Sequence, residues 1–156
     1  MDSIDIIKLA RSLIDIDSTS GRETEACKWL GSWLRDRNYQ VVEQPVANDR
    51  FNIIATLDSP PDVVFSTHID CVPPFFPSRE ENGLLFGRGA CDAKGILAAQ
   101  LAALERLRSD GEHRVALLVV VGEERGSQGA RAANTRPLGS RSVSYTHLTL
   151  PTILLV

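Results

Sequence analysis

The chain opens with apolar residues at helical spacing. In "SIDIIKLARSLIDI" (residues 3–16) and again in "SGRETEACKWLGSWLRDRN" (residues 20–38), apolar side chains recur every three or four positions. This pattern predicts two helices, the second with its tryptophans in the core. Ser20 followed by Glu23 matches a capping box, which predicts the start of the second helix.

From residue 39 the pattern changes to that of strands. "YQVVEQPV" and "FNIIATL" are rich in β-branched and aromatic residues, and the intervening "ANDR" predicts a hairpin turn. "VVFST" predicts a third strand, and the continuously apolar "RVALLVVVG" predicts a central strand covered on both faces. A helix is expected from about residue 93 to 108, and "SQGARAAN" is expected to start another. Strands alternating with helices predict an α/β sheet with crossover helices.

Composition and charge narrow the classes of partner. The 156 residues are 43% hydrophobic and 24% charged, as in an ordinary globular domain. A net charge of -3 with scattered basic residues argues against nucleic acid. No apolar run reaches the roughly 20 residues of a membrane helix, and the first residues lack the basic and apolar regions of a signal peptide. We therefore expect no membrane partner and a cytoplasmic location.

The three cysteines do not suggest a disulfide framework. Cys27, Cys71 and Cys91 are odd in number and include no CxxC pair, so reduced thiols are expected instead of disulfides or a structural zinc knuckle. Cys71 and Cys91 flank acidic residues, and adjacent positions of an extended chain point to opposite sides. Both are therefore predicted to be packing thiols.

Three polar clusters lie where strands of the predicted sheet should finish. They are "HID" (residues 68–70), "GACDAKG" around Asp92 and "GEE" (residues 122–124). Ligands of α/β sheets bind at the carboxyl ends of strands, so we expect these clusters to meet. His68 and Asp70 alternate along an extended chain, so the Asp70 carboxylate can hydrogen-bond the imidazole or share its ligand. Neighbouring glutamates in a cleft repel each other, which favours a bound cation.

Each cluster taken alone has a simpler interpretation. An isolated HxD is more often a surface pair, and two consecutive glutamates are usually solvated. "GRGACDAKG" could instead form a phosphate loop, but it lacks the GK[ST] ending of a Walker loop and the GxGxxG of a dinucleotide fold. Lys94 is interpreted as a structural or surface residue.

Together the clusters resemble a known family. "STHIDCVP", "LFGRGACDAKG" and "VVVGEERGSQGA", in this order, resemble the zinc-dependent amidohydrolases and exopeptidases that include acetylornithine deacetylase, succinyl-diaminopimelate desuccinylase, aminoacylase and carboxypeptidase G. The resemblance extends from the first helix to about Ser140. It implies an α/β three-layer sandwich with a mixed, largely parallel central sheet.

The resemblance also implies roles for individual residues. His68 would bind one metal ion, Asp92 would bridge two, and Glu124 would bind the second. Asp70 would orient His68, and Glu123 would be the general base. The implied cofactors are two divalent ions, zinc first, with cobalt or manganese as alternatives. Two such ions can polarise an amide carbonyl and acidify water, while a carboxylate moves the proton to the leaving amine.

The implied activity is hydrolysis of the amide bond of a small N-acyl amino acid, of the acetylornithine deacetylase or succinyl-diaminopimelate desuccinylase type, in amino-acid biosynthesis. A dipeptidase or carboxypeptidase of the same family is the alternative, and a non-catalytic binding relative ranks lower. The expected partners are an N-acyl amino acid or a dipeptide, and a homodimer of the full-length protein stays open.

The C-terminal tail has a different origin. Residues 143–152 read Val-Ser-Tyr-Thr-His-Leu-Thr-Leu-Pro-Thr, which resembles the translated transposon-end adapter of sequencing libraries. We therefore expect residues 1–142 to be an incomplete N-terminal part of the catalytic domain and residues 143–156 to be a non-native tail, so that His147 is no ligand candidate. A further carboxylate, a late histidine and the lid or dimerisation domain of the family are missing, so this truncated chain is expected to be inactive and to bind zinc weakly.

Overall fold

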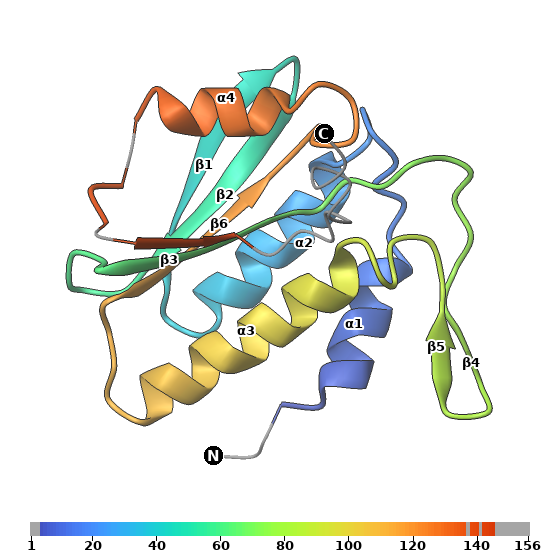
Figure 1. The fold of residues 1–156 in the computed structure, drawn as a ribbon, viewed down its shortest axis with the longest axis horizontal. Helices are drawn as coiled ribbons and strands as arrows, with labels where there is room; N and C mark the ends of the chain where they lie inside the picture. Colours follow the sequence, from blue (N-terminus) through green and yellow to red (C-terminus); the bar gives the residue numbers. More distant parts are fainter. Residues whose placement is uncertain (1–3, 137, 141, 146–156) are drawn as a thin grey trace, which may run out of the picture.

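A mixed five-stranded sheet forms the centre of the protein. The computed structural model describes residues 4–136, 138–140 and 142–145. The strand order is β1-β2-β6-β3-β7, with antiparallel pairs β1/β2 and β2/β6 and parallel pairs β6/β3 and β3/β7. The strands are β1 (Gln40–Ala47), β2 (Arg50–Thr56), β3 (Val63–His68), β6 (Val115–Val120) and β7 (Ser142–Tyr145). This confirms the predicted mixed α/β fold, the β1–β2 hairpin and the central position of β6 (Figure 1).

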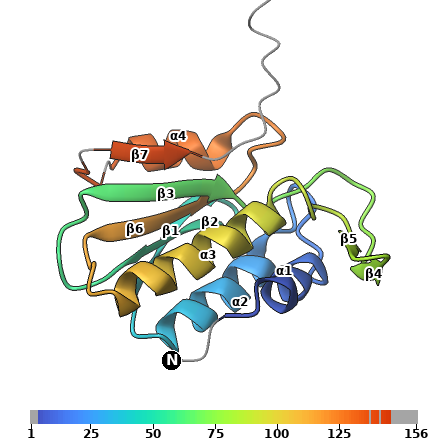
Figure 2. The same ribbon diagram turned by 60° about the horizontal axis from the view of Figure 1, so that its bottom comes forward.

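Helices cover both faces of the sheet. The helices are α1 (Ile6–Ile14), α2 (Thr24–Arg35), α3 (Lys94–Ser109) and α4 (Gln128–Asn134). Figure 2 shows α1, α2 and α3 together on one side of the sheet and α4 on the other, which gives three layers. The side chains of β6 alternate between these layers. Val115, Leu117 and Val119 belong to the core beneath α1 to α3, whereas Leu118 and Val120 line a cavity of about 400 Å³ together with residues of α4.

The core lies between the sheet and the three N-terminal helices. Its fully buried side chains include Leu13, Leu30, Leu34, Leu97 and Leu101. Each buried leucine contributes about 2 kcal/mol of hydrophobic stabilisation. The two tryptophans of α2 are half-buried and pack against this core, as predicted.

The predicted capping box is wrong. The residue before α2 is Glu23, and its side chain makes no capping hydrogen bond to the helix. Its Oε2 instead accepts from the backbone N–H of Gly21 at 2.9 Å, and the hydroxyl of Ser20 donates to Asp70. The Ser20 hydroxyl bonds a residue 50 positions away, and Glu23 Oε1 pairs with Arg50, 27 positions away. The local sequence does not reveal these long-range contacts, which take the place of the reciprocal cap.

Two short strands of the described part lie outside the central sheet. A short hairpin of β4 (Arg79–Glu81) and β5 (Leu84–Phe86) follows the proline-rich loop.

Among the described helices, none combines the length and the apolar character that crossing a membrane requires. The expected non-native tail begins within β7, and its residues 146–156, including His147, lie outside the described residues. The domain boundary at residue 142 therefore stays a prediction.

Candidate metal centre

Parallel pairing of β3 with β6 brings the predicted clusters to one edge of the sheet. His68 is the last residue of β3 and is in register with Val120, the last residue of β6. Glu123 and Glu124 follow β6 after a turn, and Asp92 lies in the loop that leads into α3. The clusters meet as expected, but only two of them follow strands of the central sheet, whereas Asp92 reaches the same edge from the loop before α3.

Three side chains converge closely enough to share an ion. One ligand atom each from His68, Asp92 and Glu124 lies within 4.8 Å of the other two. His68 Nε2 is 2.9 Å from Asp92 Oδ1. One imidazole nitrogen with two carboxylate oxygens is a donor set that suits zinc and related divalent cations. The residues therefore fit the metal that the sequence indicated.

His68 is completely buried and is held from behind by Asp70. Its Nδ1 lies 3.0 Å from the backbone oxygen of Asp70 and 3.5 Å from Oδ1 of the same residue. Burial opposes the charged imidazole, but the hydrogen bond and charge of Asp70, together with Asp92 and Glu123, raise the pKa of His68 to about 9. The contact with Asp70 on Nδ1 leaves Nε2 to face Asp92, which is the orientation a metal ligand needs.

The Asp70 carboxylate also fixes the turn that carries the two glutamates. Oδ1 accepts from the backbone N–H of Glu123 at 2.9 Å, and Oδ2 accepts from that of Glu124 at 3.1 Å. Oδ2 accepts a third hydrogen bond, from the Ser20 hydroxyl, at 2.9 Å. Burial opposes ionisation, but these donors and His68 keep the pKa of Asp70 below its usual value. Asp70 is therefore a buried anion that joins three segments of the centre.

The electrostatics of Glu124 favour a cation. Burial and the negative charges of Asp92, Asp70 and Glu123 raise the pKa of Glu124, while His68 acts in the opposite direction. A bound divalent ion would remove this repulsion. Glu123 is half-buried beside it. The specific roles expected for the five site residues stay predictions, although the structure brings all five together.

Ser20 was not indicated as a site residue by the sequence. Its spacing to Glu23 fits a helix cap, and nothing in the local pattern points to Asp70. The surrounding "STS" at residues 18–20 forms contacts with the chain just after β3: the Ser18 hydroxyl donates to Ile69 O at 2.7 Å, and Thr19 bridges to Cys71. This pairing carries Ser20 to the site.

Lys94 and Cys91 lie close to Asp92 in the chain, and the structure agrees with the interpretation of Lys94 but contradicts that of Cys91. Lys94 is fully buried, and its Nζ donates to the backbone oxygen of Ile16 at 2.7 Å, so its role is structural; burial lowers its pKa. Cys91 is exposed, which contradicts the predicted packing thiol, whereas Cys27 and Cys71 are buried and all three are free. The loop before α3 consists of turns, so the alternation of an extended chain does not apply to Cys91.

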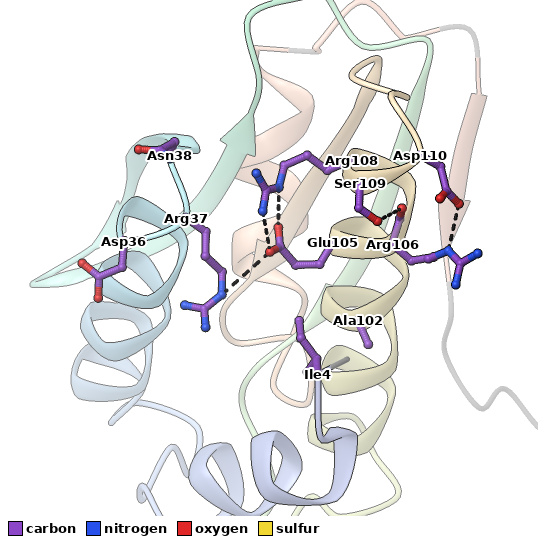
Figure 3. Close-up of a pocket in the computed structure, with 10 residues that line it drawn as sticks. All are labelled: Ile4, Asp36, Arg37, Asn38, Ala102, Glu105, Arg106, Arg108, Ser109 and Asp110. Atoms are coloured by element: carbon purple, nitrogen blue, oxygen red, sulfur yellow. Dashed lines mark hydrogen bonds and ion pairs between the residues drawn. The ribbon is translucent and has the colours of Figure 1, made fainter. Parts of the chain in front are cut away.

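A second hollow, of about 900 Å³, lies at the other end of α3. Figure 3 shows its lining of three arginines and three acidic residues, with Glu105 between Arg37 and Arg108. Glu105 accepts two hydrogen bonds of 2.9 Å from Arg108, and Arg106 donates to Asp110 at 2.9 Å. The charges thus largely satisfy one another, which favours a structural network over a ligand site.

The chain is similar to known peptidases along most of its length. A model described as "Peptidase family M20/M25/M40" matches residues 64–154. A protein of Aspergillus clavatus named "Probable carboxypeptidase" is 39% identical over 91% of this chain. A tripeptidase structure from Staphylococcus aureus covers 96% of this chain and 44% of its own, with a TM-score of 0.80 at 20% identity. An M20 family metallo-carboxypeptidase structure from Sulfolobus solfataricus covers 93% of this chain and 37% of its own, with a TM-score of 0.76 at 22% identity.

These matches also show how much of its relatives' length the chain spans. It spans 35% of the Aspergillus clavatus protein and 34% of a relative from Emericella nidulans. The chain thus corresponds to about a third of the length of the curated relatives that it matches.

Proposed function

Because the chain belongs to peptidase family M20/M25/M40, we propose that the full-length protein is a metal-dependent exopeptidase that cleaves an amide bond of a short peptide. The observation that carries this proposal is the convergence of His68, Asp92 and Glu124 within 4.8 Å, with Glu123 adjacent in the chain. Because one donor comes from each of three separate segments, a local solvated acidic pair does not account for the arrangement.

The residues divide into those that hold metal and those that act on protons. His68 and Glu124 would each hold a divalent ion, zinc first, and Asp92 would contact both. When bound, such ions would polarise the carbonyl of the substrate and lower the pKa of a water molecule that they bind. Glu123 would take the proton and deliver it to the departing amine, because a carboxylate beside the ligands is within reach of both tasks. Asp70 would keep His68 and the glutamate turn in place.

We rank the candidate substrates by the names of the relatives. The relatives' names support cleavage of a C-terminal residue from a short peptide. Hydrolysis of an N-acyl amino acid, the first expectation from the sequence, breaks the same kind of bond and is the second candidate. A cytoplasmic location and a homodimer of the full-length protein belong to the same proposal.

The test uses the full-length protein with zinc, cobalt or manganese added back after chelation. Hydrolysis of a series of dipeptides and tripeptides is compared with that of N-acetylornithine and N-succinyl-diaminopimelate. We expect activity that chelation abolishes and metal restores. Glu123→Gln should lower kcat by about 10²-fold or more at unchanged metal content. Glu25→Gln, an exposed glutamate of α2, is the matched control.

Two results would contradict the proposal. One is the absence of metal-dependent amide hydrolysis with every substrate, which would favour a non-catalytic binding relative. The other is a Glu123→Gln variant as active as the wild type.

A further inference from the structure

A buried ion pair lies outside the candidate metal centre. Glu23, just before α2, is completely buried, and Arg50, the first residue of β2, is 9% exposed. Their closest charged atoms, Glu23 Oε1 and Arg50 Nη1, are 3.3 Å apart. Burying two charges is costly, and a well-packed apolar pair often stabilises a protein as much. The pair therefore calls for an explanation beyond stability.

The Arg50 guanidinium lies against the turn that carries the two glutamates. Its Nη2 donates to the side-chain oxygen of Gln128, the first residue of α4. A methyl group added to Gly122 would lie 3.2 Å from Arg50 Nη1. Gly122 has a φ of +66° and immediately precedes Glu123, and its backbone oxygen accepts from the N–H of Gln128 at 3.3 Å. Arg50 thus bonds Gln128, which follows the turn, and lies close enough to Gly122, where the turn begins, to leave little room for a side chain there.

Through Glu23, the ion pair also reaches the segment that supports the glutamate turn from the side of Asp70. Its second oxygen, Oε2, accepts from the N–H of Gly21 at 2.9 Å. Gly21 follows Ser20, whose hydroxyl donates to the Asp70 carboxylate that holds Glu123 and Glu124. Hydrogen-bonded residues therefore enclose the glutamate turn from two directions, and Arg50 with Glu23 joins the two.

We propose that Arg50 is a positioning residue for the metal centre: through Gln128 and Gly122 it fixes the turn that presents Glu124 to His68 and Asp92. This inference rests on the proposed function, because it makes Arg50 the residue that positions the metal ligand Glu124. Arginine suits the task because two nitrogens of one rigid fork reach Glu23 and Gln128 together, which a single lysine nitrogen cannot do.

Two variants of the full-length protein test this proposal. Arg50→Lys keeps a cation beside Glu23 but gives up the simultaneous contact with Gln128. Gln128→Met removes the acceptor and leaves the Arg50–Glu23 pair intact. Gln40→Met is the control, because Gln40 is exposed at the opposite end of the β1–β2 hairpin. Zinc affinity is measured by calorimetry, and hydrogen–deuterium exchange of the peptide that contains Glu123 and Glu124 is measured by mass spectrometry without metal.

We expect both variants to bind zinc about tenfold more weakly. The amides of Glu123 and Glu124 should exchange about tenfold faster, with the β1 amides unchanged. Variants that match Gln40→Met in both measurements, or exchange that accelerates evenly along the chain, would overturn the proposal. If the wild-type protein binds no zinc, the proposed function fails, and the exchange measurement alone still decides whether Arg50 fixes the turn.

Discussion

The Ser20 hydroxyl donates a 2.9 Å hydrogen bond to Oδ2 of Asp70, although the two residues are 50 positions apart in the chain. This contact ties the connection between α1 and α2 to the carboxylate that fixes the glutamate turn. The metal centre therefore depends on a segment that contributes no ligand itself.

Ser20→Ala removes one of the three hydrogen-bond donors described for the Asp70 carboxylate. Because a hydrogen bond to a buried charge is worth about 2 kcal/mol, the free energy of unfolding should fall by about that amount. Zinc affinity should fall about tenfold because the turn loses support. Urea unfolding and zinc titration of the full-length protein measure the two effects. Ser12→Ala, which removes an exposed hydroxyl within α1, should change neither, and a Ser20→Ala variant that behaves like it would contradict the prediction.

The raised pKa of His68 predicts how metal-free protein responds to pH. Its pKa is about 9 in the folded protein against 6.5 ordinarily, so the folded state binds the proton more tightly. The resulting stabilisation is fully present below pH 6.5 and is lost as pH rises to 9, by about 3 kcal/mol in total. Unfolding of the metal-free protein at pH 6 and pH 9 tests this prediction. The pH dependence should shrink in His68→Gln and persist in the exposed control His113→Gln.

The same proton competes with the metal. A cation bound at His68 Nε2 must displace it, so zinc binding at pH 7.5 should release a proton from His68. Calorimetry in buffers of different ionisation enthalpy counts the protons released. A binding enthalpy that is independent of the buffer would show that His68 is neutral in the metal-free protein.

Gly129→Ala should destabilise the protein even though alanine favours helix. A methyl group at this position in α4 would clash with the Asn52 side-chain oxygen and with the Val121 backbone. The backbone cannot move aside cheaply, so we expect a loss of about 3 kcal/mol in the free energy of unfolding. Helix propensity alone would give a gain of about 1 kcal/mol, so the sign of the change decides. Gly31→Ala is the comparison, since its nearest neighbour is the flexible end of Arg35 and little loss is expected.

Glu105 should contribute stability that acid removes. Burial opposes its ionisation, but hydrogen bonds from Arg108 and Tyr39 keep the pKa of Glu105 below its ordinary 4.5. Its contribution is therefore present above pH 4.5 and is lost as pH falls through the lowered pKa. Between pH 6 and pH 3, Glu105→Gln should lose less stability than the wild type in urea unfolding. The control Glu80→Gln, at an exposed position, should lose as much stability between these pH values as the wild type, and equal losses in all three proteins would contradict this role.

The sequence predicted the parts of the site that follow from regular structure. Because β3 and β6 are recognisable strands, the polar residues after them could be placed at one edge, and His68, Asp70 and the two glutamates meet there. The contacts of Ser20 and Arg50 could not be predicted, because they join residues far apart in the chain. The exposure of Cys91 was mispredicted because alternation holds for strands and fails in the turns before α3.

The parallel register of His68 with Val120 has a consequence for how the protein folds. Parallel strands need a long crossover, and here that crossover contains the loop with Asp92 and the whole of α3. The entropy of closing this connection is lost before the three ligands can meet, so pairing of β3 with β6 should precede any gain from a metal ion. A divalent cation should therefore slow unfolding more than it speeds folding, because it binds only after the strands have paired.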